Sequence, residues 1–220
     1  MIAVPWNALP MTAVEPKDTS WVALAYKSAS EDLMQDSICI PVGGSHCITA
    51  PACLTAELFA AVVGFKLVGG AYLMVLGQDV DAIDMSAREE LLTRTSVLPA
   101  KGGLISYLNA WENISLPLGF HRPKLLPNAA PVVLDLLSGF GMEPRALLAK
   151  MPSVLTAREK LAVVWTRVLL ESPALVLAEA SGFGREADPA LGMPLAAFST
   201  AYQLQNPTGT FIQLENIPGN

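Results

Sequence analysis

The sequence predicts an α/β fold in which helices flank a sheet that contains parallel strands. Strand-like and helix-like segments alternate along the 220 residues. The segment Ala174–Ala178 is continuously apolar, which is typical of a central parallel strand that is buried on both faces. The helix before this strand begins with Thr156 and Glu159, which have the spacing of a capping box.

The first half of the chain holds most of the expected strands. Short apolar segments predict strands at Trp21–Tyr26, Ser37–Val42, His46–Thr49 and Ala71–Leu76. A helix is expected over Leu54–Phe65, because apolar residues recur there at helical spacing: Leu54, Leu58, Ala61, Val62 and Phe65. A short charged helix is expected at Ser86–Thr95.

The second half is predicted to be mainly helical. Helices or helical turns are expected at Ser106–Leu116, Ala130–Gly139, Arg145–Met151 and Leu195–Gln205. The helix that the capping box starts runs to about Leu170, with a buried stripe of Leu161, Val164, Trp165, Val168 and Leu169. A last strand is expected at Thr210–Leu214.

Composition limits the classes of partner. Hydrophobic residues make up 52% of the chain and charged residues 15%, which favours a large buried sheet or extensive contact with a partner. The net charge of −6 argues against a nucleic-acid partner, because phosphate binding needs a basic surface. Residues 1–20 are expected to form an N-terminal arm that is neither a signal peptide nor a membrane span.

The three cysteines are Cys39, Cys47 and Cys53, and His46 lies among them. This grouping suggests a metal site, but it has neither C-x-x-C nor H-x-x-x-H spacing. We therefore expect the cysteines to be small core residues on strands, with no metal site and no disulfide framework.

Three segments resemble motifs of the ATPase subunits of ABC transporters. Gly102–Leu118 (GGLISYLNAWENISLPL) is similar to the v-x-E-N-v-x-x-P-L pattern that follows the Q-loop. Lys150–Thr156 (KMPSVLT) is similar to the x-x-P-x-x-L-S that leads into the signature, and Lys160–Ala180 to the following helix and Walker B strand. The order and spacing agree over about Ser37–Asn216, and the similarity is greatest to the ATPases of Mla-type phospholipid transport systems, which work with MCE proteins.

The resemblance implies a P-loop NTPase-like core sheet flanked by helices, with a small antiparallel β part. It also implies a single ABC-ATPase-like domain over residues 21–220, with a helical subdomain at about residues 103–158. A position in the cytoplasm, peripheral on the inner face of the inner membrane, is expected for such a subunit.

The phosphate-binding loop of the family, G-x-x-x-x-G-K-[ST], corresponds in length and position to A-P-A-C-L-T-A-E, residues 50–57. Its degenerate positions are Ala50, Cys53, Thr55, Ala56 and Glu57. Both glycines are missing, Ala56 stands at the lysine position, and Glu57 stands at the Ser/Thr position. Glu57 is expected in the first turn of the helix, where its carboxylate would repel a triphosphate.

The other functional motifs of the family are also replaced. The signature L-S-G-G becomes Leu155-Thr156-Ala157-Arg158. The Walker B aspartate becomes Glu179 and the catalytic glutamate becomes Ala180. The Q-loop glutamine falls near Ala100 and the H-loop histidine near Glu215, and Asp188-Pro189 alone resembles the D-loop. The resemblance therefore implies an ATPase fold without catalytic residues, and neither ATP nor magnesium is expected as a cofactor.

Three functions are compatible with the sequence. The first is a non-catalytic subunit or regulator that binds a transporter permease, a catalytic ABC ATPase subunit, or both. In the family a groove beside the Q-loop accepts the permease, and here it would be lined by Leu104, Tyr107, Leu108 and Trp111, unless these residues only pack in the core. The second is a nucleotide-binding ATPase subunit that uses residues from a partner chain. The third is an unrelated small-molecule module with a pocket around Cys53 and Thr55.

Overall fold

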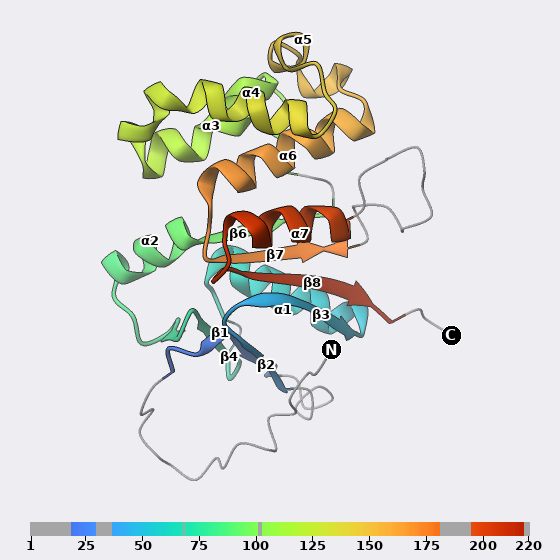
Figure 1. The fold of residues 1–220 in the computed structure, drawn as a ribbon. Coiled ribbons are helices and arrows are strands. Elements are labelled where there is room, and N and C mark those ends of the chain that lie inside the picture. Colours follow the sequence, from blue (N-terminus) through green and yellow to red (C-terminus); the bar gives the residue numbers. More distant parts are fainter. Residues whose placement is uncertain (1–18, 30–36, 68, 101–102, 181–194, 218–220) are drawn as a thin grey trace. The chain divides into compact units, whose positions relative to one another are not determined.

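The computed structural model describes residues 19–29, 37–67, 69–100, 103–180 and 195–217 (Figure 1). The chain divides into two compact units. The first unit comprises Met1–Val97, Ala174–Glu179 and Asn206–Asn220. The second comprises Leu98–Pro173 and Ala180–Gln205.

The first unit contains an antiparallel sheet with the strand order β2-β1-β4-β5. Its strands are β1 (Val22–Lys27), β2 (Ser37–Pro41), β4 (Tyr72–Val75) and β5 (Gln78–Asp79). Leu76 and Gly77 both have positive φ, at 48° and 77°, which is the geometry of a tight hairpin turn between β4 and β5. A Cβ atom on Gly77 would lie 2.7 Å from the carbonyl oxygen of Thr19, so this turn requires glycine.

The second sheet of the first unit has the strand order β3-β8-β7-β6. Its strands are β3 (Gly44–Ala50), β6 (Thr95–Leu98), β7 (Leu175–Glu179) and β8 (Thr210–Asn216). β3 and β7 both run parallel to β8. Leu175, Val176, Leu177 and Ala178 are completely buried, which confirms the prediction of a central parallel strand.

Helix α1 (Ala52–Gly64) joins the two sheets into one core, and α2 (Met85–Arg94) follows the hairpin. The five residues of the predicted α1 stripe are all buried. They pack in the same cluster as Leu24 and Leu73 of the antiparallel sheet and Leu177 and Ile212 of the parallel sheet. The helical spacing of apolar residues therefore predicted the face of α1 that packs against both sheets.

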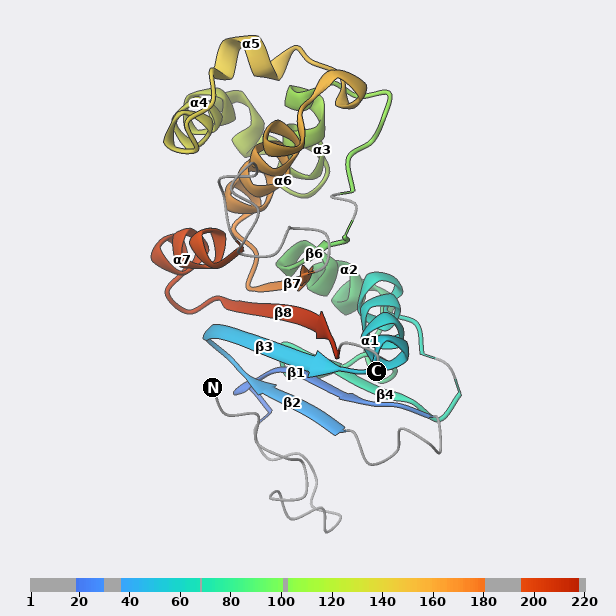
Figure 2. The same ribbon diagram turned by 90° about the vertical axis from the view of Figure 1, so that its right-hand side faces the viewer.

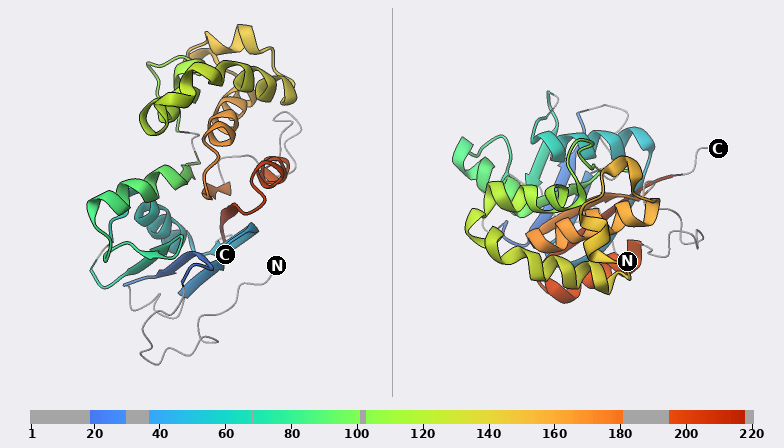
Figure 3. Two further views of the ribbon diagram at one scale, coloured as in Figure 1. Left: turned by 60° about the vertical axis from the view of Figure 1, so that its left-hand side comes forward. Right: turned by 90° about the horizontal axis from the view of Figure 1, so that it is seen from above.

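The second unit is helical. It contains α3 (Ala110–His121), the 3-10 helix η3 (Pro123–Asn128), α4 (Ala129–Gly139), α5 (Pro144–Leu148), the 3-10 helix η4 (Pro152–Val154), α6 (Ala157–Glu171) and α7 (Leu195–Gln205). Both views of Figure 3 show α3, α4 and α6 packed together. Their shared core contains Ile114, Val133, Leu137 and Val163.

The buried stripe of α6 is confirmed at all five predicted positions. Trp165 lies at its centre, with its ring stacked on that of Phe198 at 4.9 Å and edge-on to that of Phe140 at 5.8 Å. None of the described helices is both long enough and apolar enough to cross a bilayer.

Some predicted boundaries were wrong. The helix expected from Ser106 begins at Ala110, because Asn109 and Glu112 form a capping box there, and it continues past Pro117 to His121. The helix expected to end at Thr95 ends one residue earlier, and the apolar residues that follow it form strand β6. The turn expected at Arg145–Met151 is helical only over α5.

Candidate functional site

The segment that corresponds to the phosphate-binding loop is not a loop. Strand β3 ends at Ala50 and α1 begins at Ala52, so only Pro51 separates strand from helix. The tip of β3 meets the base of α1 in Figure 2. All positions from Ala52 to Glu57, with Cys53 and Ala56 exposed, belong to α1. The segment that matches a phosphate loop in length is therefore mainly helix.

Hydrogen bonds close the junction between β3, α1 and β8. The carbonyl oxygen of Pro51 accepts from the backbone N–H groups of Leu54 and Thr55, at 2.9 and 3.1 Å. The buried hydroxyl of Thr55 makes its shortest contact with Oδ1 of Asn216, at 2.5 Å. The N–H of Ile217 donates to the carbonyl oxygen of Ala50 at 2.9 Å. The end of β8 is therefore tied to the place where a phosphate loop would begin.

Glu57 does not lie in the first turn of α1, as the sequence had suggested, because the helix begins at Ala52. Its carboxylate faces the antiparallel sheet instead. The hydroxyl of Tyr26 donates to Oε1 of Glu57 at 2.5 Å, and the hydroxyl of Ser28 lies 3.0 Å from both carboxylate oxygens. Burial, and then the bond to Glu57, raise the pKa of Tyr26 far above its usual range. Glu57 therefore links α1 to β1.

Glu179 occupies the tip of β7, as predicted for a Walker B position. It is half-buried, pairs in register with Leu214 of β8, and is followed directly by Ala180. The carboxyl edge of a parallel sheet is where ligands usually bind in α/β folds. At this edge β7 ends with the carboxylate of Glu179. The next residue, Ala180, has no side-chain group that could polarise a water molecule.

Glu215, at the H-loop position, belongs to a polar strip on β8 and β3. Its carboxylate accepts a hydrogen bond from Nε2 of Gln213. It pairs in register with Thr49, whose hydroxyl lies 3.8 Å from the sulfur of Cys47. Burial is the main cause that raises the pKa of the Cys47 thiol.

The cysteines do not share one environment. Cys39 is buried, Cys47 is half-buried, and Cys53 is exposed at the start of α1. The expectation of core residues on strands is therefore wrong for Cys53. Within the described ranges, no group of three His, Cys, Asp or Glu side chains is arranged to hold a metal ion.

The signature position is the capped start of α6. The hydroxyl of Thr156 accepts from the N–H of Glu159 at 3.2 Å, and Oε2 of Glu159 accepts from the N–H of Thr156 at 2.8 Å. Nζ of Lys150 donates to Oε1 of Glu159 at 2.6 Å. This bond to Lys150 is the main cause that lowers the pKa of Glu159. The predicted capping box is therefore confirmed, and it is extended by an ion pair.

The predicted partner-binding residues divide by exposure. Tyr107 is 77% exposed, whereas Leu104, Leu108 and Trp111 are half-buried. Leu104 and Trp111 also pack against the core of the helical unit. Tyr107 is thus the most exposed member of this group.

Asn113 is the residue that sequence reasoning missed. It is buried in α3, and its Nδ2 donates to the carbonyl oxygens of Ile105, Leu108 and Asn109 at 2.8 to 3.1 Å. Its Oδ1 accepts from the N–H of Ile105 at 2.7 Å. The E-N pair of the family pattern was a signal for this anchor, which fixes the loop that carries Tyr107.

Two predicted features lie outside the described residues. These are the D-loop-like pair Asp188-Pro189 and residues 1–18 of the expected N-terminal arm.

Comparison with solved structures identifies the fold. CbiO1 from Clostridium perfringens, part of the ABC transporter complex CbiONQ, has a TM-score of 0.59 and 14% identity, over 89% of this chain and 79% of that one. The ATP-binding cassette MJ0796, solved as a dimer with ADP and Pi in a post-hydrolysis state, has a TM-score of 0.59 and 15% identity, over 87% of each chain. No family model matches the sequence, and neither does any curated protein. The chain has the P-loop NTPase-like α/β fold of ABC-transporter ATPases.

Proposed function

We propose that this chain is a non-catalytic subunit or regulator of a membrane transporter, built on the ABC-ATPase fold and acting through protein–protein contact. The junction between β3 and α1 carries the proposal. A phosphate loop cradles its ligand with several consecutive backbone N–H groups in an open turn. Here a single residue, Pro51, replaces that turn, and proline has no N–H to donate.

The chemistry of the neighbouring side chains supports the same conclusion. Ala56 offers no cation to the outer phosphates, and Ala180 offers no base to a water molecule. Loss of a lysine and of two or three loop donors weakens phosphate binding by about 4–6 kcal/mol, which is roughly a thousandfold or more in affinity. The residues present at this site therefore do not suit the binding and hydrolysis of ATP.

The alternative, a nucleotide-binding subunit completed by a partner chain, has less support. A partner can lend side chains, but it cannot lend the backbone turn that is missing between Ala50 and Ala52. The start of α6 is likewise occupied by Glu159 and Lys150 of the chain itself. A small-molecule pocket around Cys53 and Thr55 is disfavoured because Thr55 is buried and bonded to Asn216.

The partner we propose is a transporter permease, a catalytic ABC ATPase subunit, or both, and the contact includes Tyr107. The expected place is the inner face of the membrane, without a nucleic-acid or nucleotide ligand. The phospholipid and MCE assignment rests on the three sequence segments that resemble the Mla-type ATPases.

Site-specific photo-crosslinking in the source cells tests the proposal. A photoreactive amino acid replaces Tyr107, and in a matched control it replaces Leu204, which is 79% exposed on α7. The expected result is an adduct with an integral membrane permease or an active ABC ATPase at position 107 and its absence at position 204. No adduct at position 107, or the same adduct at both positions, would contradict the proposed contact.

A further inference from the structure

Basic side chains gather where α3 ends and η3 begins. No Asp or Glu occurs between Glu112 and Asp135, whereas this stretch contains His121, Arg122 and Lys124. The whole chain, in contrast, carries a net charge of −6. The turn between α3 and α4 is therefore a cationic segment of an acidic protein.

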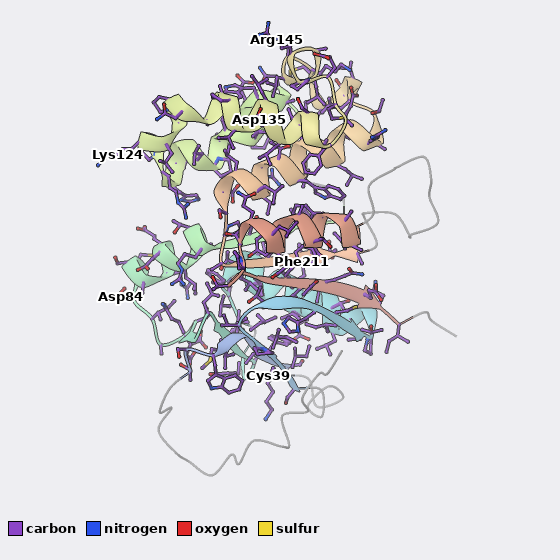
Figure 4. All side chains as sticks on the ribbon, viewed as in Figure 1. Cys39, Asp84, Lys124, Asp135, Arg145 and Phe211 are labelled. Carbon is purple, nitrogen blue, oxygen red and sulfur yellow. The ribbon has the colours of Figure 1, made fainter. Side chains whose placement is uncertain are left out.

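Large apolar side chains are exposed beside these basic residues. Phe120 is 77% exposed and Leu125 is 51% exposed, and His121, Arg122 and Lys124 are exposed as well. Figure 4 shows Lys124 projecting outward from the end of the helical unit at which η3 lies. These five residues are called the basic-apolar tip below.

The backbone holds the basic-apolar tip in one arrangement. The N–H of Arg122 donates to the carbonyl oxygen of Leu118 at 2.8 Å, and the N–H of Leu125 donates to that of Arg122 at 2.9 Å. Pro123 and Pro127 fix φ within the same turn. The side chains are therefore presented together without a large loss of backbone entropy on binding.

We propose that the basic-apolar tip binds the surface of an anionic lipid bilayer. Aromatic and aliphatic side chains flanked by Lys and Arg are the composition of segments that lie in the membrane interface. Phe120 and Leu125 enter the headgroup boundary, and Arg122 and Lys124 attract anionic headgroups. A protein partner is less suitable, because a stable protein interface needs roughly 20–30 residues on each side.

Burial raises the pKa of Glu171, at the end of α6, and the charges of Arg167 and Arg122 lower it. Arg122 therefore interacts electrostatically with one carboxylate of the chain itself. Lys124 forms no ion pair within the described part of the chain, and Asp135 lies on α4 rather than in the turn. The charge of Lys124 is thus available to a membrane.

This inference goes beyond the proposed function, because it uses the opposite end of α3 from Tyr107. A helix of 12 residues spans about 18 Å, so the two surfaces can be tested by separate substitutions. Failure of the crosslinking experiment leaves the lipid measurement unaffected, and the reverse also holds.

Vesicle sedimentation with the full chain tests the inference. The vesicles consist of phosphatidylcholine alone or of phosphatidylcholine with about one third phosphatidylglycerol. Binding is expected only to the anionic vesicles, with a loss at high salt. The variant Arg122→Gln/Lys124→Gln is expected to bind about 25-fold more weakly, at about fivefold per charge.

Matched variants show whether vesicle binding depends on the basic-apolar tip itself or only on the net charge of the chain. Arg145→Gln/Lys160→Gln removes the same charge from exposed positions of the same helical unit, and it is expected to bind within twofold of the original chain. Arg145 belongs to α5 and lies away from Lys124 in Figure 4. Phe120→Ser is expected to weaken binding severalfold, whereas Leu204→Ser, at a similarly exposed leucine, leaves it unchanged.

Three results would overturn the inference. The first is no binding of the original chain to anionic vesicles at low salt. The second is an equal loss in the two charge-removing variants, at unchanged melting temperature. The third is retention on immobilised polyglutamate that depends on Arg122 and Lys124 without binding to vesicles, which would assign the tip to an acidic protein.

Discussion

Two helices of this chain begin at positions that the family resemblance assigns to nucleotide binding. Their first turns differ in how the backbone is capped. Helix α1 has no side-chain cap, and Pro51 joins it directly to β3. Helix α6 has a full capping box, and Lys150 pairs with its glutamate. The start of α1 thus lacks a loop, whereas the backbone N–H groups at the start of α6 are bonded by side chains of the chain itself.

The two helix starts are also stabilised by different parts of the chain. The start of α6 is stabilised locally, by residues close in sequence. The start of α1 depends on distant residues, since Asn216 bonds Thr55 and Tyr26 bonds Glu57. Substitutions at the two helices should therefore differ in size and in what they disturb.

The largest effect is expected at Glu57. Glu57→Ala removes the acceptor of the buried hydroxyls of Tyr26 and Ser28, so the free energy of unfolding should fall by about 2–3 kcal/mol. Urea unfolding measures the change, with Glu89→Ala on α2 as an exposed control. A loss below about 0.5 kcal/mol would show that α1 is not held through Glu57.

The next largest effect is expected at Glu171, at the end of α6. Unlike the capped start of this helix, its end holds a carboxylate that lowers stability when it is ionised. Burial raises the pKa of Glu171 from 4.5 to about 7, against the charges of Arg167 and Arg122. Between these pH values the folded chain binds the proton more tightly than the unfolded chain, so stability falls as the pH rises from about 4.5 to about 7. Glu171→Gln should remove this decline and add about 2 kcal/mol at pH 8.

Urea unfolding at pH 5 and pH 8 checks the prediction for Glu171. The exposed Glu143 supplies the control variant Glu143→Gln, which should keep the pH dependence of the original chain. The same decline in Glu171→Gln would contradict the assignment of the buried proton to Glu171.

The capping box of α6 is expected to contribute less than Glu57. Glu159→Ala removes the bond to the N–H of Thr156 and the ion pair with Lys150, so a loss of about 1–2 kcal/mol is expected. Thr156→Ala should lose about 1 kcal/mol, and the double variant less than the sum, because the two residues cap each other. Ser153→Ala, at an exposed position of η4, is the control. Additive losses would contradict the reciprocal cap.

The smallest effect is expected at the closed junction of α1. Thr55→Val removes the hydroxyl bonded to Asn216, but Asn216 is exposed and water replaces the bond. The expected loss is about 0.5–1 kcal/mol, measured by thermal unfolding. A loss above about 2 kcal/mol would mean that Asn216 is not accessible to water.

Part of the fold was predictable because burial follows a period in the sequence. The stripes of α1 and α6 and the continuous apolar strand β7 were predicted correctly, since each buries a face that the pattern marks. The strand β6 was missed because its four residues follow a charged helix without a turn signal. Strand β6 forms because it pairs with β7, which is distant in sequence, so its own residues do not predict it.

The candidate site was only partly predictable. Residues 50–57 have the length of a phosphate loop, but Ala, Leu and Glu favour helix where glycine would favour a turn, and the segment became the start of α1. The segments that resemble the family most closely are the ones that build the fold. Asn113 anchors a loop, Leu155 is buried in the helical core, and Thr156 caps α6.

Calorimetric titration of the purified chain with Mg·ATP, combined with thermal unfolding, tests the central claim most directly. Because Pro51 alone separates β3 from α1, we expect no heat of binding and an unchanged Tm up to millimolar nucleotide. A ligand present at 100 times its Kd would stabilise the fold by about 2.7 kcal/mol, so real binding would be visible in both measurements. A micromolar Kd with a matching rise in Tm would contradict the account and identify the chain as a nucleotide-binding subunit.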